Sequence, residues 1–164
     1  SDGFSSALNS FTGQNYGAQK YSRVVKGYYT SVKIISIVGI IATLLLILAA
    51  GPIFSIFIPE KNVIPYGIDY LRILGISQFF MCIEIVTQGA FYGLGRTIPP
   101  SIISILFNAS RIPLALLLSK ESVFGLNGVW WSISITSILK GIILSIWFLY
   151  FLRNKLPNIK CTNL

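Results

Sequence analysis

The apolar pattern of this chain consists of long stretches separated by short charged gaps. Residues 34–59 contain no charged side chain, and the three later stretches, the last of which ends at residue 152, contain one each. A helix of about 20 apolar residues crosses the ~30 Å hydrocarbon layer of a membrane. Stretches such as IIATLLLILAA do not alternate as the strands of a membrane barrel do. We therefore predict an all-α, polytopic membrane helix bundle with spans at about residues 34–58, 66–95, 99–119 and 126–152.

The remaining segments are too short or too polar to span. The first dozen residues would rise only ~18 Å as a helix, so we expect residues 1–18 to be the C-terminal half of a truncated transmembrane helix. We expect residues 19–33 to form a basic cytoplasmic linker and residues 153–164 a cytoplasmic tail. Two interpretations of the linker stay open. It is either a segment lying at the membrane interface or the start of a helix whose lysines reach toward the headgroups.

The charge balance is typical of a membrane protein. Hydrophobic residues make up 54% of the chain and charged residues 11%, against about 25% charged in soluble domains. The net charge of +8 lies in the gaps between apolar stretches, so we expect a lipid bilayer and no nucleic acid as partner. Grouping alternate gaps places eight basic residues on one side of the membrane and two on the other. The positive-inside rule then predicts a multi-pass plasma-membrane protein with a cytoplasmic C-terminus.

The composition also limits the chemistry. The chain has no histidine, and its two cysteines, Cys82 and Cys161, do not have the spacing of a zinc site. The central parts of the spans offer no convincing pair of nucleophile and base. We therefore expect neither an enzyme nor a bound cofactor or structural metal, apart from a sodium ion that Glu84 could help to hold.

Three ionisable residues lie near the midpoints of consecutive spans: Glu84, Arg111 and Lys140. A charge at the centre of a membrane helix costs ~2.5–3.5 kcal/mol on insertion scales, so three at one depth should face each other or a wet cavity. In one interpretation, Glu84 is a coupling carboxylate that loads a proton or helps to hold Na⁺, and attracts a cationic substrate. In the other, Glu84 forms a buried ion pair with Arg111 or Lys140 that only fixes helix packing. The sequence leaves both open.

Neutral polar side chains accompany these charges. Gln88 follows Glu84 by four residues and so shares its helix face, and Asn108 precedes Arg111 by about one turn. Such residues line a polar cavity or bond to a neighbouring helix. The candidate residues for transport and ion coupling are therefore Glu84, Gln88, Asn108, Arg111 and Lys140.

Two pairs of glycines have the spacing that lets membrane helices approach closely, Gly13 with Gly17 and Gly89 with Gly93. The first pair, with Gln14 between its members, belongs to a GQxxGA element. This element resembles the end of the eighth helix in multidrug and toxic compound extrusion (MATE) transporters.

Three further motifs follow in the order of that family. The turn that contains Gly93, Gly95, Thr97 and Pro100 resembles the one after its tenth helix. The RIPLA segment, with Arg111 and Pro113, resembles part of its eleventh helix, and the stretch GLNGVW at residues 125–130 resembles the start of its twelfth. The chain is thus similar to most of the second lobe of a MATE transporter.

The resemblance implies a twelve-helix protein of two lobes, so the N-terminal lobe would be a partner that this chain lacks. It also implies a secondary active antiporter that exports organic cations, drugs or metabolites in exchange for H⁺ or Na⁺. The aspartate of the best-known Na⁺-coupled subgroup would fall at Met81 rather than at Glu84, so the resemblance does not select the coupling ion. The alternatives are a lipid-linked saccharide flippase of the same superfamily and a non-catalytic structural subunit of the membrane.

Overall fold

The computed structural model describes residues 1–57, 64–119 and 125–155 of the chain. These residues form helices throughout, which confirms the predicted all-α fold. The helices are α1 (Asp2–Gly17), α2 (Tyr21–Leu48), α3 (Ala50–Phe57), α4 (Ile64–Gly93), α5 (Ile98–Leu118) and α6 (Leu126–Lys155). The helices α2, α4, α5 and α6 are long and apolar enough to cross a membrane.

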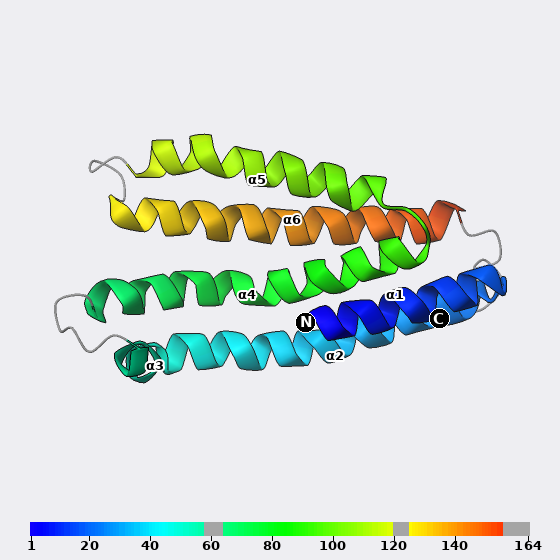
Figure 1. Ribbon diagram of the computed structural model, residues 1–164, viewed down its shortest axis with the longest axis horizontal. Coiled ribbons are helices and arrows are strands. Elements are labelled where there is room, and N and C mark those ends of the chain that lie inside the picture. Colours follow the sequence, from blue (N-terminus) through cyan, green and yellow to red (C-terminus); the bar gives the residue numbers. More distant parts are fainter. Residues whose placement is uncertain (58–63, 120–124, 156–164) are drawn as a thin grey trace.

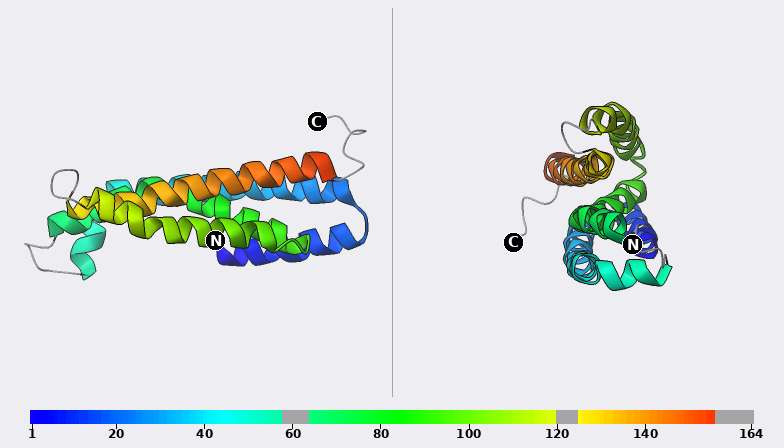
Figure 2. Two further views of the ribbon diagram at one scale, coloured as in Figure 1. Left: turned by 90° about the horizontal axis from the view of Figure 1, so that it is seen from above. Right: turned by 90° about the vertical axis from the view of Figure 1, so that its left-hand side faces the viewer.

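Helix α4 occupies the middle of the bundle (Figure 1). It packs against α1 and α2 on one side and against α6 on the other, whereas α5 packs mainly on α6. The end-on view in Figure 2 shows the same order, with α5 as the outermost helix on its side. Polar residues of α4 therefore meet neighbours on two sides, while α2 and α5 leave most of their surface open.

The open surfaces of the outer helices are apolar. Leu48 on α2 is 80% exposed and Ile105 on α5 is 71% exposed, and further leucine and isoleucine side chains on both helices are also exposed. In water such surfaces would cost free energy, at about 25 cal/mol per Å². In lipid they are in contact with hydrocarbon, so the exposed pattern fits the predicted membrane bundle.

The predicted linker at residues 19–33 and the predicted span at 34–58 are wrong in their boundaries. One continuous helix, α2, runs from Tyr21 to Leu48. Its buried positions Val24, Tyr28 and Ile35 recur at helical spacing and pack in the core, while the basic residues between them are exposed. Burying this stripe favours a helix, so the interpretation of the segment as a helix start is confirmed.

The first span also ends earlier than predicted, because the chain breaks at Ala49. Helix α3 follows and turns across the end of the bundle (Figure 2). Pro52 lies in its first turn and has no N–H to bond the Leu48 carbonyl, which favours a break in the helix at this point. Residue 58, the predicted end of this span, lies outside the described residues. The predicted boundaries of the other three spans agree with α4, α5 and α6 to within three residues.

The helix directions place several basic positions at one end of the bundle. The start of α2, the turn between α4 and α5, and the end of α6 lie together at the right of Figure 1. Arg96 in that turn lies over the Phe151 ring of α6, at 5.6 Å from its centroid. The predicted grouping of these segments on one side of the membrane is therefore consistent with the fold. That this side is cytoplasmic stays a prediction.

Candidate functional site

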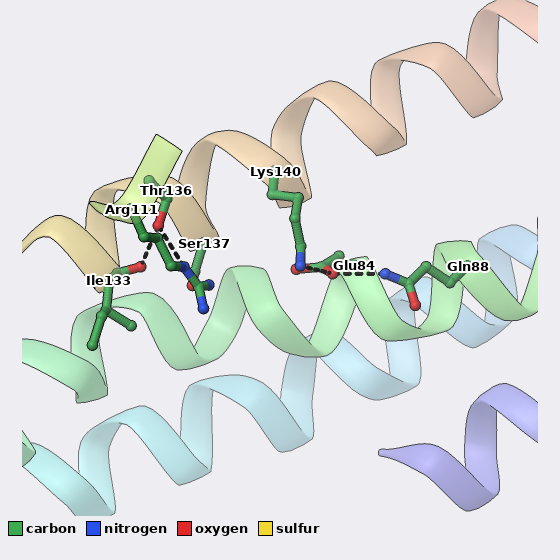
Figure 3. Close-up of polar contacts among 7 residues, drawn as sticks. All are labelled: Glu84, Gln88, Arg111, Ile133, Thr136, Ser137 and Lys140. Atoms are coloured by element: carbon green, nitrogen blue, oxygen red, sulfur yellow. Dashed lines mark hydrogen bonds and ion pairs between the residues drawn. The ribbon is translucent and has the colours of Figure 1, made fainter. Parts of the chain in front are cut away.

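A buried ion pair joins the two central helices. The Lys140 ammonium on α6 lies 2.9 Å from Glu84 Oε1 on α4. Gln88, one turn further along α4, donates a hydrogen bond from Nε2 to the same oxygen at 2.7 Å (Figure 3). Glu84 is only 5% exposed and Lys140 only 8%. The site thus combines one negative and one positive charge, both withdrawn from the surface of this bundle.

The close approach of α6 to α4 at this level depends on Gly141, the neighbour of Lys140. A Cβ atom at Gly141 would lie 2.7 Å from the Phe80 carbonyl oxygen of α4, so no larger residue fits without moving a helix. Nearer the start of α6, Ser134 donates a hydrogen bond of 2.8 Å to the Ile73 carbonyl of α4. These contacts fix the register in which Lys140 reaches Glu84.

Arg111 does not join this pair. Its Nε donates to Thr136 Oγ1 at 3.0 Å and its Nη2 donates to Ser137 Oγ at 2.9 Å, both on α6 (Figure 3). Thr136 in turn donates to the Ser132 carbonyl at 2.8 Å, so its hydroxyl both accepts and donates. Of the three mid-span charges that we expected to face each other or a wet cavity, Glu84 and Lys140 therefore face each other, whereas Arg111 bonds to α6 about one turn away.

Asn108 is exposed on α5, and its side chain makes no hydrogen bond with the residues that the structure describes. Of the five candidate residues, Glu84, Gln88 and Lys140 therefore meet directly. Arg111 lies beside them, and Asn108 lies apart from them.

A buried cluster of hydroxyl groups was not found by sequence reasoning. Tyr28 Oη of α2 and Thr87 Oγ1 of α4 are 3.1 Å apart, and Thr87 Oγ1 is 3.5 Å from Ser145 Oγ of α6. Thr87 also donates to the Ile83 carbonyl at 2.8 Å. The sequence contained one indication of this cluster, because Thr87 follows Glu84 by three residues and so lies near it on the same helix face. The pattern did not show which residues of the other two helices would reach it.

The glycine motifs act through packing. A Cβ atom at Gly93 would lie 2.5 Å from the Asn9 carbonyl oxygen, and one at Gly89 would collide with the Ser5 carbonyl, so both let α1 lie close to α4. A Cβ atom at Gly13 would lie 3.3 Å from the Gly93 carbonyl, whereas one at Gly17 would meet nothing within 4 Å. The predicted close approach is therefore confirmed for three of the four glycines. Gln14, between the first two, is exposed.

The turn after α4 shows why its motif contains Gly95. This residue has a φ of +69°, a left-handed conformation that glycine adopts without strain. The Gly95 N–H bonds the Tyr92 carbonyl at 2.9 Å and the Arg96 N–H bonds the Phe91 carbonyl at 3.0 Å, which is a Schellman motif that ends the helix.

The other motif residues shape α5. Thr97 is its N-cap residue, and Pro100 is buried in its first turn, where a missing N–H costs nothing. Pro113 lies inside the same helix, two residues after Arg111.

Comparison with known proteins places this chain in a family. The profile of the MatE family matches residues 2–117. The "Probable multidrug resistance protein NorM" of Thermotoga maritima is 30% identical over 133 residues, which are 78% of this chain and 28% of that protein.

A solved structure has the same fold. It is described as the "inward-facing conformation of a multidrug resistance MATE family transporter of the MOP superfamily", and it matches with a TM-score of 0.83 at 21% identity. The match covers 91% of this chain and 35% of that one, so the chain spans about a third of the length of the proteins it matches. On the family match and the relative, this chain belongs to the multidrug and toxic compound extrusion (MATE) family.

Proposed function

We propose that this chain is part of a secondary active antiporter that exports organic cations, drugs or metabolites in exchange for H⁺ or Na⁺. The observation that carries the proposal is Glu84, a carboxylate 5% exposed in the middle of a membrane helix of a MATE-family protein. Ionisable residues at this depth are expensive and usually serve an ion or substrate pathway. The relative that is named as a multidrug resistance protein supports the choice of substrate class.

In this proposal Glu84 carries the negative charge that either the coupling ion or a cationic substrate uses. Protonation would neutralise it. Na⁺ would bind its oxygens together with the Gln88 side-chain carbonyl once the amide, whose Nε2 now faces Glu84, has turned, and such oxygen ligands suit a hard cation. Exchange requires that the two cations occupy the site in turn while access alternates between the two sides of the membrane. The second wall of the cavity would come from an N-terminal lobe, and the C-terminus would be cytoplasmic.

The alternative of a lipid-linked saccharide flippase would use Arg111 and Lys140 to hold phosphate groups. In the structure the charge of Lys140 is already balanced by Glu84, and Arg111 is bound by two hydroxyl groups. Neither basic side chain is therefore free to hold a phosphate group, and the buried carboxylate gives the site an acidic group that a cation antiporter needs.

The test is transport by the protein expressed from its complete reading frame in proteoliposomes. Ethidium movement is followed under an imposed proton or sodium gradient. We expect Glu84→Gln to abolish gradient-driven movement, since the neutral amide cannot exchange cations. The matched control is Asp69→Asn, which removes an exposed carboxylate from the same helix and should leave transport unchanged. Gel filtration checks that both variants fold. Full gradient-driven transport by Glu84→Gln would remove Glu84 from the mechanism.

A further inference from the structure

The Glu84 carboxylate already has a cation beside it. Lys140 Nζ and Gln88 Nε2 both lie against Oε1, at 2.9 and 2.7 Å. The side chains of Lys140 and Glu84 are 11% and 7% exposed, so little water screens their attraction. A second cation approaching this carboxylate meets a pair with no net charge. It therefore gains a strong electrostatic contact only if Lys140 moves away.

The Lys140 side chain has few alternative polar partners on its own helix. The hydroxyl groups nearest to it on its own helix face are those of Thr136 and Ser137, four and three residues before it. Arg111 already donates to both, at 3.0 and 2.9 Å. Its guanidinium group also repels the Lys140 ammonium because both are positive. Arg111 thus occupies the nearby alternative position, about one turn of α6 from the Lys140–Glu84 pair (Figure 3).

We propose that Lys140 is a tethered counter-cation, which competes with the transported cation for Glu84 and is kept in place by Arg111. This inference rests on the proposed cation transport and adds the order of events at the site. With no solute bound, Lys140 neutralises the carboxylate. An organic cation that binds Glu84 displaces Lys140, and the return of Lys140 helps to expel that cation. The Lys140–Glu84 pair therefore lowers the affinity for the transported cation and so permits its release.

This proposal differs from a purely structural pair in the sign of its effect. Replacing Lys140 by glutamine removes the competitor and leaves Glu84 with only the Gln88 amide. Affinity for a cation should then rise, while turnover should fall because release loses its driving contact. A pair that only holds α4 to α6 predicts the reverse for affinity, since loosening the two helices cannot improve a binding site.

The experiment measures the Kd of ethidium by fluorescence anisotropy, using the protein expressed from its complete reading frame in detergent. We expect Lys140→Gln to bind about tenfold or more tightly than the unchanged protein, since removal of an adjacent charge in a poorly screened site is a strong effect. Lys140→Arg keeps the charge and should retain the original Kd. The double variant Glu84→Gln/Lys140→Gln should lose the gain. Lys33→Gln, which removes an exposed positive charge from α2, controls for net charge and should change nothing.

Arg111→Gln provides a second route if Lys140→Gln does not fold. It frees the hydroxyl groups of Thr136 and Ser137 for Lys140, so ethidium should bind more tightly than in the unchanged protein, but less tightly than after loss of the lysine. Unchanged or weaker binding in folded Lys140→Gln, or in Arg111→Gln where Lys140→Gln does not fold, would overturn the counter-cation role, even if the unchanged protein exports ethidium. Weaker ethidium binding after loss of Lys140 would indicate that the lysine only holds α4 to α6. Absence of binding and export in every variant would overturn both this inference and the proposed function.

Discussion

Gly93 is the position where a single methyl group should most clearly separate α1 from α4. A Cβ atom there would lie 2.5 Å from the Asn9 carbonyl oxygen and 2.6 Å from Thr12 Cβ. Ordinary contacts of a Cβ atom begin near 3.4 Å, so Gly93→Ala requires a shift of nearly 1 Å. The first obstacle is a backbone atom inside a helix, which cannot rotate away. The whole of α1 has to move.

The expected cost follows from what this movement loosens. Overpacking of a well-packed contact costs about 1–3 kcal/mol. The hydrogen bond from Ser5 Oγ to the Ile85 carbonyl, 2.8 Å long, also joins α1 to α4, and losing it adds about 0.5–1.5 kcal/mol. The better helix propensity of alanine offsets up to about 1 kcal/mol of this loss of stability. We therefore expect Gly93→Ala to lower the free energy of unfolding by about 0.5–3.5 kcal/mol.

Gly17→Ala is the matched control, because it adds the same methyl group to α1, one of the same two helices. A Cβ atom at Gly17 meets nothing within 4 Å, so this variant should be as stable as the unchanged protein or slightly more stable. The assay is the midpoint of thermal unfolding in detergent, followed by tryptophan fluorescence for both variants side by side. Equal midpoints for Gly93→Ala and Gly17→Ala would refute the close approach of α1 and α4.

Three further changes test other contacts by the same thermal assay. Gly95→Ala should cost about 1–2 kcal/mol, because an L side chain is strained at a φ of +69°, and an unchanged midpoint would contradict the left-handed turn. Tyr28→Phe removes the bond to Thr87 and should cost about 0.6 kcal/mol, the average for such bonds in membranes, so a loss near 3 kcal/mol would mean a larger role. Lys140→Met alone should cost about 3–5 kcal/mol by leaving the Glu84 charge unpaired, whereas Glu84→Gln/Lys140→Met should recover most of it; equal losses would mean the pair is not formed.

The fold was predictable wherever apolar length alone decides the structure. A stretch such as residues 97–119 has one stable state in lipid, a helix that satisfies its own backbone, and α5 has these boundaries within one residue. The predicted start of the first span was wrong because it was placed directly after a charged residue. Lys33 is charged but exposed on one face of α2, so the helix passes through it. The break after Leu48 depends on the local backbone near Pro52, which an apolar count does not register.

The depth of the candidate site residues in the membrane was predictable, but the direction in which their side chains point was not. Counting residues from the loops fixed the level of Glu84, Arg111 and Lys140, because helix rise is constant. It could not fix which way each side chain points around its axis, nor the distance between two helices. Those depend on Gly141, which lets α6 approach α4, and on the place of α5 outside α6. Packing therefore decided that Lys140, and not Arg111, neutralises Glu84.

The position of α5 has a consequence for how the site could operate. Arg111 reaches the site only through the hydroxyl groups of α6, since α5 makes little contact with α4. The Arg111 bonds join α5 to α6, whereas the Lys140–Glu84 pair joins α6 to α4. Helix α6 therefore carries both clusters, and a change at Arg111 reaches Glu84 through this helix.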